Sequence, residues 1–492
     1  MAQRPAPFRD LDWDPERARA FADEIVGVWT ELLGSFRDGP VVPPHLTQEA
    51  VREAVALDVP DDPMPPDALV AHLREAVLDY SLKSGHPAHL AYITGTGTVP
   101  GAAADLLASG LNPNVGGWLL SPAATEIELC LTRWLAGLLG LPETAGGMIV
   151  AGGGVANFIS LKVARDAMAG VKTRQTGVTA KLAIYCSEEA HVTIDRAADM
   201  LGLGTEAVRH VPVDEAFRMR PDALLEAIRA DLSAGVSPGI VVGTAGTTAT
   251  GSIEPLDDLA EIAAEHGMWF HVDAAYGGAL GLSDELRPLL KGIERADSIT
   301  LDPHKWLSTP LGSGCIVVRD IQSLSDSFGV YAAYVHEEEG IDRGLNLGFM
   351  GPQFSRGFDA LKVWVSLLAH GRKAYATRIE HDIELTRYLA ACVEEHPDFE
   401  LLATGLSICC FRYRPEGTDD EEHLNRLNER LLSELQLDGR VYPSNAIVHG
   451  RFCLRTCIVN FRTEADDLDL VLEVAAELGA KLHAGASSTL PS

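Results

Sequence analysis

Two side chains that could hold a carbonyl cofactor each lie just after a short apolar run. Lys305 follows residues 298–301 within Asp302-Pro303-His304-Lys305-Trp306, and Asp273 ends the run Phe270-His271-Val272-Asp273. A lysine amine can form an imine with an aldehyde, and a carboxylate can hold a protonated pyridine nitrogen. This pair indicates pyridoxal 5'-phosphate (PLP), although a lone lysine after a strand is more often a solvated surface residue.

Further candidates also follow apolar runs, where parallel α/β sheets bind ligands. The turn Ala151-Gly152-Gly153-Gly154 precedes a helical pattern and leaves backbone N–H groups free for an anion. It is not a Walker loop, because no Gly-Lys-Ser/Thr follows. His191 could stack on a planar ring, and Gly246-Thr247-Thr248 places hydroxyls at another strand end. Taken singly, each also fits a structural reading as a turn, helix start or cap.

The elements that must position these residues alternate between helical patterns and short apolar runs. The predicted strands are residues 147–150, 182–186, 239–243, 268–272, 298–301 and 315–318, and one intervening helix is residues 256–266. Such alternation favours an α/β fold with a mostly parallel central sheet flanked by helices. We therefore expect a large cofactor-binding domain over residues 99–373.

Both ends of the chain differ from this middle region. Residues 1–98 read as a helical arm, with helices at 15–33 and 67–82 and an irregular proline-rich connector from 41 to 66. An arm with little core of its own is expected to pack against a partner subunit; a floppy extension is the alternative. Residues 374–492 mix helices and strands as a small α+β domain, and residues 484–492 read as a frayed tail.

Composition excludes several classes of partner. The chain has 492 residues, 40 Lys+Arg against 70 Asp+Glu and a formal net charge of -30. Such a surface repels nucleic acid and anionic membranes. No signal peptide or membrane-spanning stretch is visible, and the eight cysteines show neither Cys-x-x-Cys pairs nor zinc spacing. We expect a cytoplasmic protein with free thiols and no metal site.

Read together, these motifs resemble those of the group II PLP-dependent decarboxylases, the aromatic-amino-acid and glutamate decarboxylase family of fold type I. The similarity includes His86-Pro87, residues 106–112, residues 121–128 and Leu139-Gly140-Leu141-Pro142. It continues through the cofactor motifs already described and covers most of the chain. Each motif is weak alone, whereas their combination and order are highly specific.

The resemblance implies a role for each candidate. Lys305 would form the internal aldimine, and Asp273 would hold the pyridinium nitrogen. His191 would stack on one face of the ring, and Ala275 would lie against the other. The remaining contacts implied around the phosphate and the ring are Gly153, Gly154, Asp302, His304 and Thr248. The resemblance also implies a homodimer with sites at the subunit interface.

The group that protonates the substrate Cα departs from the family pattern. Relatives use a loop tyrosine, and the corresponding position here falls near Leu347 or Phe349. Tyr331, Tyr334 or His304 are the possible substitutes. Loss of the tyrosine in relatives accompanies oxidative deamination to aldehydes, so the same scaffold allows an aldehyde synthase or a C–C lyase as an alternative.

The substrate pocket is expected to include Tyr92 and Trp118. Gly116-Gly117 stands where aromatic-acid members carry bulk, and no single arginine marks the chain as specific for glutamate. We therefore predict a PLP-dependent decarboxylase of amino-acid metabolism that converts an unspecified L-amino acid to a primary amine and CO2. A non-catalytic scaffold protein is disfavoured, because a scaffold has no need for an imine-forming lysine.

Overall fold

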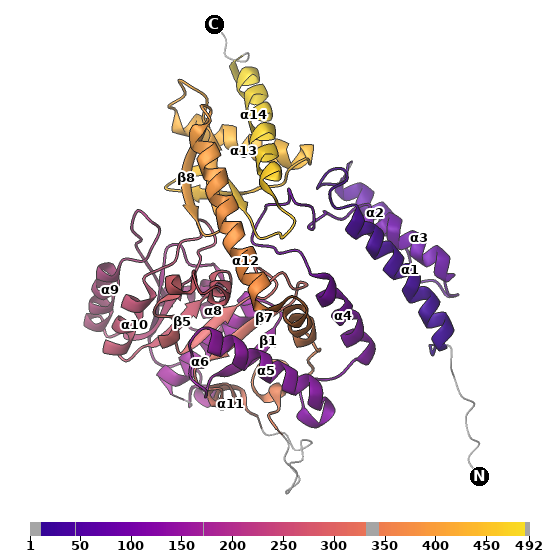
Figure 1. Ribbon diagram of the computed structural model, residues 1–492. Coiled ribbons are helices and arrows are strands. Elements are labelled where there is room, and N and C mark those ends of the chain that lie inside the picture. The colour runs from indigo at the N-terminus through magenta and orange to yellow at the C-terminus, as the bar shows by residue number, and fades with distance from the viewer. Residues whose placement is uncertain (1–10, 45, 171, 331–343, 488–492) are drawn as a thin grey trace, which may run out of the picture.

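A computed structural model describes residues 11–44, 46–170, 172–330 and 344–487, and its centre is a seven-stranded sheet (Figure 1). The strand order is β1-β7-β6-β5-β4-β2-β3. The strands are β1 (Gly146–Val150), β2 (Leu182–Ser187), β3 (Val208–Val211), β4 (Ser237–Thr244), β5 (Trp269–Asp273), β6 (Ser298–Leu301) and β7 (Gly314–Val318). Only β7 runs against the others, so the expected mostly parallel sheet is confirmed.

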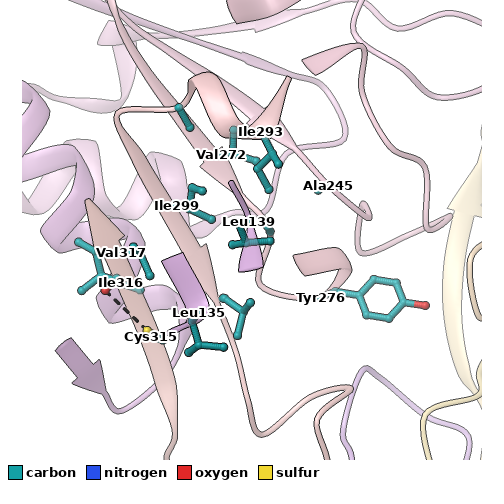
Figure 2. Close-up of a cluster of buried hydrophobic side chains, with 14 of the residues drawn as sticks. Leu135, Leu139, Ala245, Val272, Tyr276, Ile293, Ile299, Cys315, Ile316 and Val317 are labelled. Atoms are coloured by element: carbon teal, nitrogen blue, oxygen red, sulfur yellow. Dashed lines mark hydrogen bonds between the residues drawn. The ribbon is translucent and has the colours of Figure 1, made fainter. Parts of the chain in front are cut away.

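Helices cover both faces of this sheet. Every residue of β1, β6 and β7 is buried, and successive strand residues point to opposite faces, so neither face is open to water. The covering helices include α5 (Pro122–Leu138), α6 (Gly153–Ala169), α9 (Pro221–Ser233) and α10 (Leu256–Glu265). Figure 2 shows part of this core, where Leu135 of α5 and Leu139, just after that helix, lie close to strand residues such as Ile299 and Ile316.

A four-stranded antiparallel sheet follows the large sheet in the sequence, with strand order β10-β11-β9-β8. Its elements are β8 (Phe399–Gly405), β9 (Ile408–Tyr413), β10 (Ser444–Val448), β11 (Arg451–Cys457), α13 (Glu421–Asp438) and α14 (Ala465–Ser487). The long α12 (Ala360–Glu395) breaks at Gly371, where φ is 73°. The tail prediction was wrong for residues 484–487, which continue α14.

The N-terminal helices lie together at one side of the molecule (Figure 1). They are α1 (Pro15–Gly34), α2 (Gln48–Val55) and α3 (Pro66–Leu73), the last extended by a π-helical turn over Arg74–Leu78. The prediction of an irregular connector was wrong in its middle, where α2 forms between the proline clusters. Thr47 caps this helix by accepting a hydrogen bond from the backbone N–H of Ala50. The predicted helix 67–82 ends at Leu78. No residue of α1 or α2 is buried.

Residues 86–98 then pass between the two sheets and pair with distant parts of the chain. The backbone N–H of Leu90 donates to Tyr442 O at 3.0 Å, and the N–H of Cys457 donates to Leu90 O at 2.9 Å. The N–H of Thr98, which caps the following α4 (Val99–Leu111), donates to Ser308 O at 2.9 Å. In the part of the chain that the structure describes, no helix is both long enough and apolar enough to cross a membrane.

Candidate active site

Most of the predicted site residues lie around one pocket at the carboxyl ends of β1, β2, β4, β5 and β6. The lining residues are Ile93, Gly153, Gly154, Asn157, His191, Thr193, Thr244, Gly246, Thr248, Asp273, Ala275, Tyr276, Asp302 and Lys305. A larger surface hollow of about 610 Å³ lies by α5 and residues 281–294 and contains none of these side chains. The chemistry of the lining, and not its size, therefore marks the candidate site.

Lys305 is held by the loop that follows β6. Its Nζ lies 3.1 Å from Oδ2 of Asp302, whose side chain is almost fully buried. The second carboxylate oxygen, Oδ1 of Asp302, has no hydrogen-bond partner among the described residues. Gly95 packs directly against this loop, because a Cβ at Gly95 would lie 2.2 Å from the carbonyl oxygen of Lys305. The lysine is therefore both charge-paired and fixed through its backbone.

Asp273 ends β5 and is 7% exposed. Its Oδ2 accepts a hydrogen bond from Nδ2 of Asn157 at 2.7 Å, and its Oδ1 accepts from the backbone N–H of Ala275 at 3.1 Å. No described cation forms an ion pair with it. A buried carboxylate that lines a pocket without a counter-ion is suited to a protonated ring nitrogen.

His191 lies near the start of α8 (Thr193–Met200), and its Nδ1 lies 2.9 Å from Oγ1 of Thr193. Burial lowers the pKa of His191 below its ordinary value, with the charge of Asp273 opposing that effect. The imidazole is therefore neutral at pH 7, as a ring that stacks on a cofactor should be.

The glycine turn lies where α6 begins, and its glycines are required by space. A Cβ on Gly153 would lie 2.7 Å from Oδ2 of Asp302 and 3.3 Å from Cβ of Ala275. A Cβ on Gly154 would lie 3.2 Å from Cγ2 of Thr193. The N-terminus of α6 thus presents backbone N–H groups to the pocket without side chains in the way.

Two further predicted residues lie at different depths. Thr248 lines the pocket, next to Gly246, whose φ of 89° favours glycine. His304 lies behind the pocket wall: its Nε2 is 3.8 Å from Oδ2 of Asp302, and a Cβ on Gly152 would touch its ring at 3.3 Å. Burial lowers the pKa of His304, so this imidazole is also neutral.

The predicted substrate contacts stand apart from this pocket in the single chain. Tyr92 is 61% exposed, with φ at 59°, while its neighbour Ile93 lines the pocket. Trp118 donates from Nε1 to Oε1 of Glu126 at 2.8 Å. A substrate role for Tyr92 and Trp118 therefore stays a prediction.

Of the three predicted proton donors, only His304 lies within the described residues. Tyr331 and Tyr334 lie outside the described residues. Leu347 is fully buried in a short 3-10 helix, Leu347–Phe349. Neither Leu347 nor Phe349, near which the family tyrosine is expected, carries a hydroxyl group.

Sequence reasoning missed Asn157, Thr193, Thr244 and Tyr276. Asn157 stands four residues after Gly153, which places it one helical turn beyond the glycines on the same face of α6, so its signal was present. Tyr276 stacks on Trp306 with ring centroids 4.7 Å apart. Figure 2 shows its hydroxyl directed away from the aliphatic core, and this hydroxyl contacts Ser407.

The residues present fit PLP. Its aldehyde needs a lysine amine, and its ring nitrogen needs a buried carboxylate without a counter-ion. Its ring face needs a neutral imidazole, and its phosphate needs an open helix N-terminus. The comparisons with known proteins agree. A model of the pyridoxal-dependent decarboxylase conserved domain matches residues 49–414.

Relatives align over nearly the whole chain. It is 31% identical over 470 residues to the aromatic-L-amino-acid decarboxylase of Bacillus atrophaeus, covering 95% of this chain and 96% of that one. It is 29% identical to phenylacetaldehyde synthase of Arabidopsis thaliana, covering 90% and 92%. The crystal structure of Oryza sativa TDC with PLP and tryptamine superposes with a TM-score of 0.88 at 28% identity, covering 96% and 99%.

Fold and pocket together define a PLP-dependent enzyme with an α/β architecture. Because the family model spans most of its length, the chain belongs to the pyridoxal-dependent decarboxylase family. It is a carboxy-lyase that uses PLP to decarboxylate an amino acid.

Proposed function

We propose that Lys305 is the covalent attachment point of PLP and that Asp273 holds its ring nitrogen. The observation that carries this assignment is the presence of Lys305, Asp273 and the glycine turn on the wall of one pocket. Bound PLP supplies an electron sink for the charge left on the substrate Cα when CO2 departs.

The protein's own groups prepare the site for that chemistry. The 3.1 Å pair between Lys305 Nζ and Asp302 keeps the amine at the pocket wall and gives its proton an acceptor. The backbone N–H groups at the start of α6, from Gly153 and Gly154, bind the phosphate. His191 covers the ring as a neutral imidazole, and Ala275 lies on the opposite side with too little bulk to tilt it.

The substrate we propose is an L-amino acid with an uncharged side chain, aromatic ones first. Among the described lining residues, the only cationic side chain is Lys305, so nothing there would pair with a side-chain carboxylate. Ile93, Ala275 and Tyr276 supply apolar surface instead. The named activity of the Bacillus atrophaeus relative supports the same class.

The attachment point is tested by reducing the PLP-loaded enzyme with borohydride and locating the label by peptide mass analysis. The label is expected on Lys305 and should be absent from Lys305→Arg. Lys291→Arg, which alters an exposed lysine paired with Asp257, is the matched control and should label as the parent does. A label elsewhere, or none, overturns the assignment.

The substrate is tested with a panel of L-amino acids, including glutamate, in which CO2, amine, ammonia, peroxide and aldehyde are measured together. The highest kcat/KM is expected for tyrosine, tryptophan or phenylalanine, with CO2 and amine formed in equal amounts. A preference for glutamate would contradict the proposed pocket chemistry.

Oxidative deamination to an aldehyde is the alternative outcome. One observation favours it: neither Leu347 nor Phe349, near which the loop tyrosine is expected, has a hydroxyl proton to give. A named relative is an aldehyde synthase. Ammonia and peroxide formed in step with CO2 in the same panel would select this reaction in place of simple decarboxylation.

We also propose a homodimer, and the cytoplasm as its compartment. Exposed leucines gather on α4 and the segments after it: Leu106, Leu107, Leu111, Leu119 and Leu120, each between 53% and 67% exposed. An apolar surface of this kind is typical of a protein interface. The eight cysteines are all free, six of them buried, which fits a reducing compartment.

A further inference from the structure

Asn157 lies at the centre of a buried hydrogen-bond network beneath the proposed cofactor site. Its side chain is 1% exposed. Nδ2 lies 2.7 Å from Oδ2 of Asp273 and 3.0 Å from Oγ1 of Thr193. On the other side, Oδ1 lies 2.7 Å from Oγ1 of Thr300 and 3.1 Å from Nε2 of His271. All four contacts of the amide are therefore made.

The contact with the carboxylate of Asp273 fixes the orientation of this amide. A carboxylate offers only lone pairs, so the NH2 group of Asn157 must face it and the amide oxygen must face His271. The oxygen cannot donate, and therefore Nε2 of His271 must carry a proton. Burial lowers the pKa of His271 to about 4, so the ring is neutral. With the proton on Nε2, Nδ1 carries a lone pair and can only accept a hydrogen bond.

The groups beyond His271 agree with this direction. Nε1 of Trp269, which can only donate, lies 2.9 Å from Oγ of Ser298. The Ser298 hydroxyl proton is then free for Nδ1 of His271, 2.9 Å away. The carbonyl oxygen of Ser298 lies 3.2 Å from the same Nδ1 and would favour the opposite tautomer. That tautomer would leave lone pairs facing each other across the contact with Asn157.

The same direction continues to His191. Thr193 Oγ1 accepts from Asn157, so its own proton can go to Nδ1 of His191, 2.9 Å away. The backbone N–H of Thr193, which can only donate, also points at this Nδ1 from 3.3 Å. Nδ1 of His191 is therefore an acceptor, and the neutral ring carries its proton on Nε2.

We propose that Asn157 is a positioning residue that fixes the carboxylate of Asp273 and the tautomer of His191 through one chain of hydrogen bonds running in a single direction. The chain begins at Trp269 and passes through Ser298, His271, Asn157 and Thr193 to His191. This inference rests on the proposed roles of Asp273 and His191. It adds that one residue sets these two groups together, because the amide of Asn157 donates both to Asp273 and to Thr193, the hydrogen-bond partner of His191.

The first test compares two ligands of the apoenzyme: PLP, and its 1-deaza analogue, in which a C–H replaces the ring nitrogen. Asn157 acts on the ring nitrogen only through Asp273, so Asn157→Ala should weaken PLP by about tenfold or more, the range of a hydrogen bond to a charged group. The analogue should bind Asn157→Ala and the parent alike. Asn445→Ala, at an exposed position on β10, is the matched control and should change neither Kd.

The outcomes distinguish a wrong role for Asn157 from a wrong role for Asp273. Equal losses for PLP and the analogue would mean a structural role and would overturn the proposal, as would no loss for either. If the parent enzyme itself does not distinguish the two ligands, the role of Asp273 fails, which is a failure of the proposed function. Thermal unfolding of the apo variants checks that each variant is folded under the conditions in which its Kd is measured.

The second test needs no variant of Asn157. The apoenzyme, deuterated and labelled with ¹⁵N in its histidine rings, is measured by NMR at pH 7.5, and the signals are assigned with His271→Gln and His191→Gln. Both rings should carry the proton on Nε2 and a lone pair on Nδ1. A proton on Nδ1 of His271 or of His191 would overturn the proposed direction, and this measurement decides the matter if Asn157→Ala does not fold.

Discussion

His271 is a fully buried histidine whose neutrality affects stability as well as the site. Because burial lowers its pKa to about 4, the unfolded chain, with an ordinary histidine pKa near 6.5, binds its proton first as the pH falls. The unfolded state then holds more protons than the folded state between these values, and stability falls with decreasing pH. Over the whole window this group contributes roughly 3 kcal/mol.

We therefore expect His271→Gln to flatten the acid limb of the stability curve. The free energy of unfolding, measured in urea at pH 7.5 and pH 4.5, should fall less in the variant than in the parent. His266→Gln, which changes an exposed histidine at the end of α10, should keep the parental difference. Equal differences in parent and His271→Gln would show that His271 titrates alike in both states.

Gly153 gives a second prediction at this scale. Its Cβ would lie 2.7 Å from Oδ2 of Asp302, so Gly153→Ala should displace that carboxylate and weaken PLP binding by about tenfold or more. Gly137→Ala, in the last turn of α5 with open space around it, should stabilise the protein by at most about 0.5–1 kcal/mol and leave the Kd for PLP unchanged. Titration of the apoenzymes with PLP measures both effects. Unchanged PLP affinity in Gly153→Ala would contradict the close approach.

At the scale of elements, one buried ion pair joins α5, β1 and the segment that leads into α12. Arg356 donates from Nη2 to Oε1 of Glu128 and to the carbonyl oxygen of Ile149, while the Ile149 N–H donates to the same carboxylate. Both charged side chains are nearly inaccessible. Removing one partner leaves a buried charge unpaired, which costs more than removing both.

Arg356→Met is accordingly expected to lower the free energy of unfolding by about 3 kcal/mol or more. The double variant Glu128→Met/Arg356→Met should be more stable than the sum of the two single variants implies. Arg426→Met, in an exposed pair with Glu422, should cost less than about 1 kcal/mol. Urea unfolding of the parent, the two single variants, the double variant and the control gives the comparison, and additive single effects would count against a coupled pair.

The sequence predicted those elements whose patterns are strong. The six predicted apolar strands are present, because runs such as residues 298–301 are buried on both faces. β3 was not predicted, because Arg209 and His210 interrupt the apolar pattern of this short strand. The sequence motifs identified Asp273 and Lys305 as candidate site residues, but they did not predict the hydrogen-bond network through Asn157. Its members come from α6, β5, β6 and α8, and only tertiary packing brings them together.

At the scale of the whole molecule, the exposed leucines of α4 predict assembly. Leu106→Glu/Leu107→Glu should shift the protein from dimer to monomer in sedimentation experiments and lower kcat/KM, because charge is unfavourable in a buried apolar interface. Leu232→Glu, at a 53% exposed position on α9, is the control and should remain dimeric and active. A dimer that survives the double substitution at parental affinity would place the interface elsewhere.

The segment from residue 86 to 98 constrains how the chain can acquire its structure during synthesis. Its long-range backbone partners are Ser308, Tyr442 and Cys457, all made much later than the segment itself. At typical rates of translation, the interval between Leu90 and Tyr442 lasts roughly 20 to 70 s. Throughout that time the backbone groups of Leu90 lack these partners and are open to chaperones and to other nascent chains. The Gly95 end of the segment can pack against the lysine loop earlier, once residue 308 has been made, so the two ends of the segment are completed in the order opposite to their synthesis.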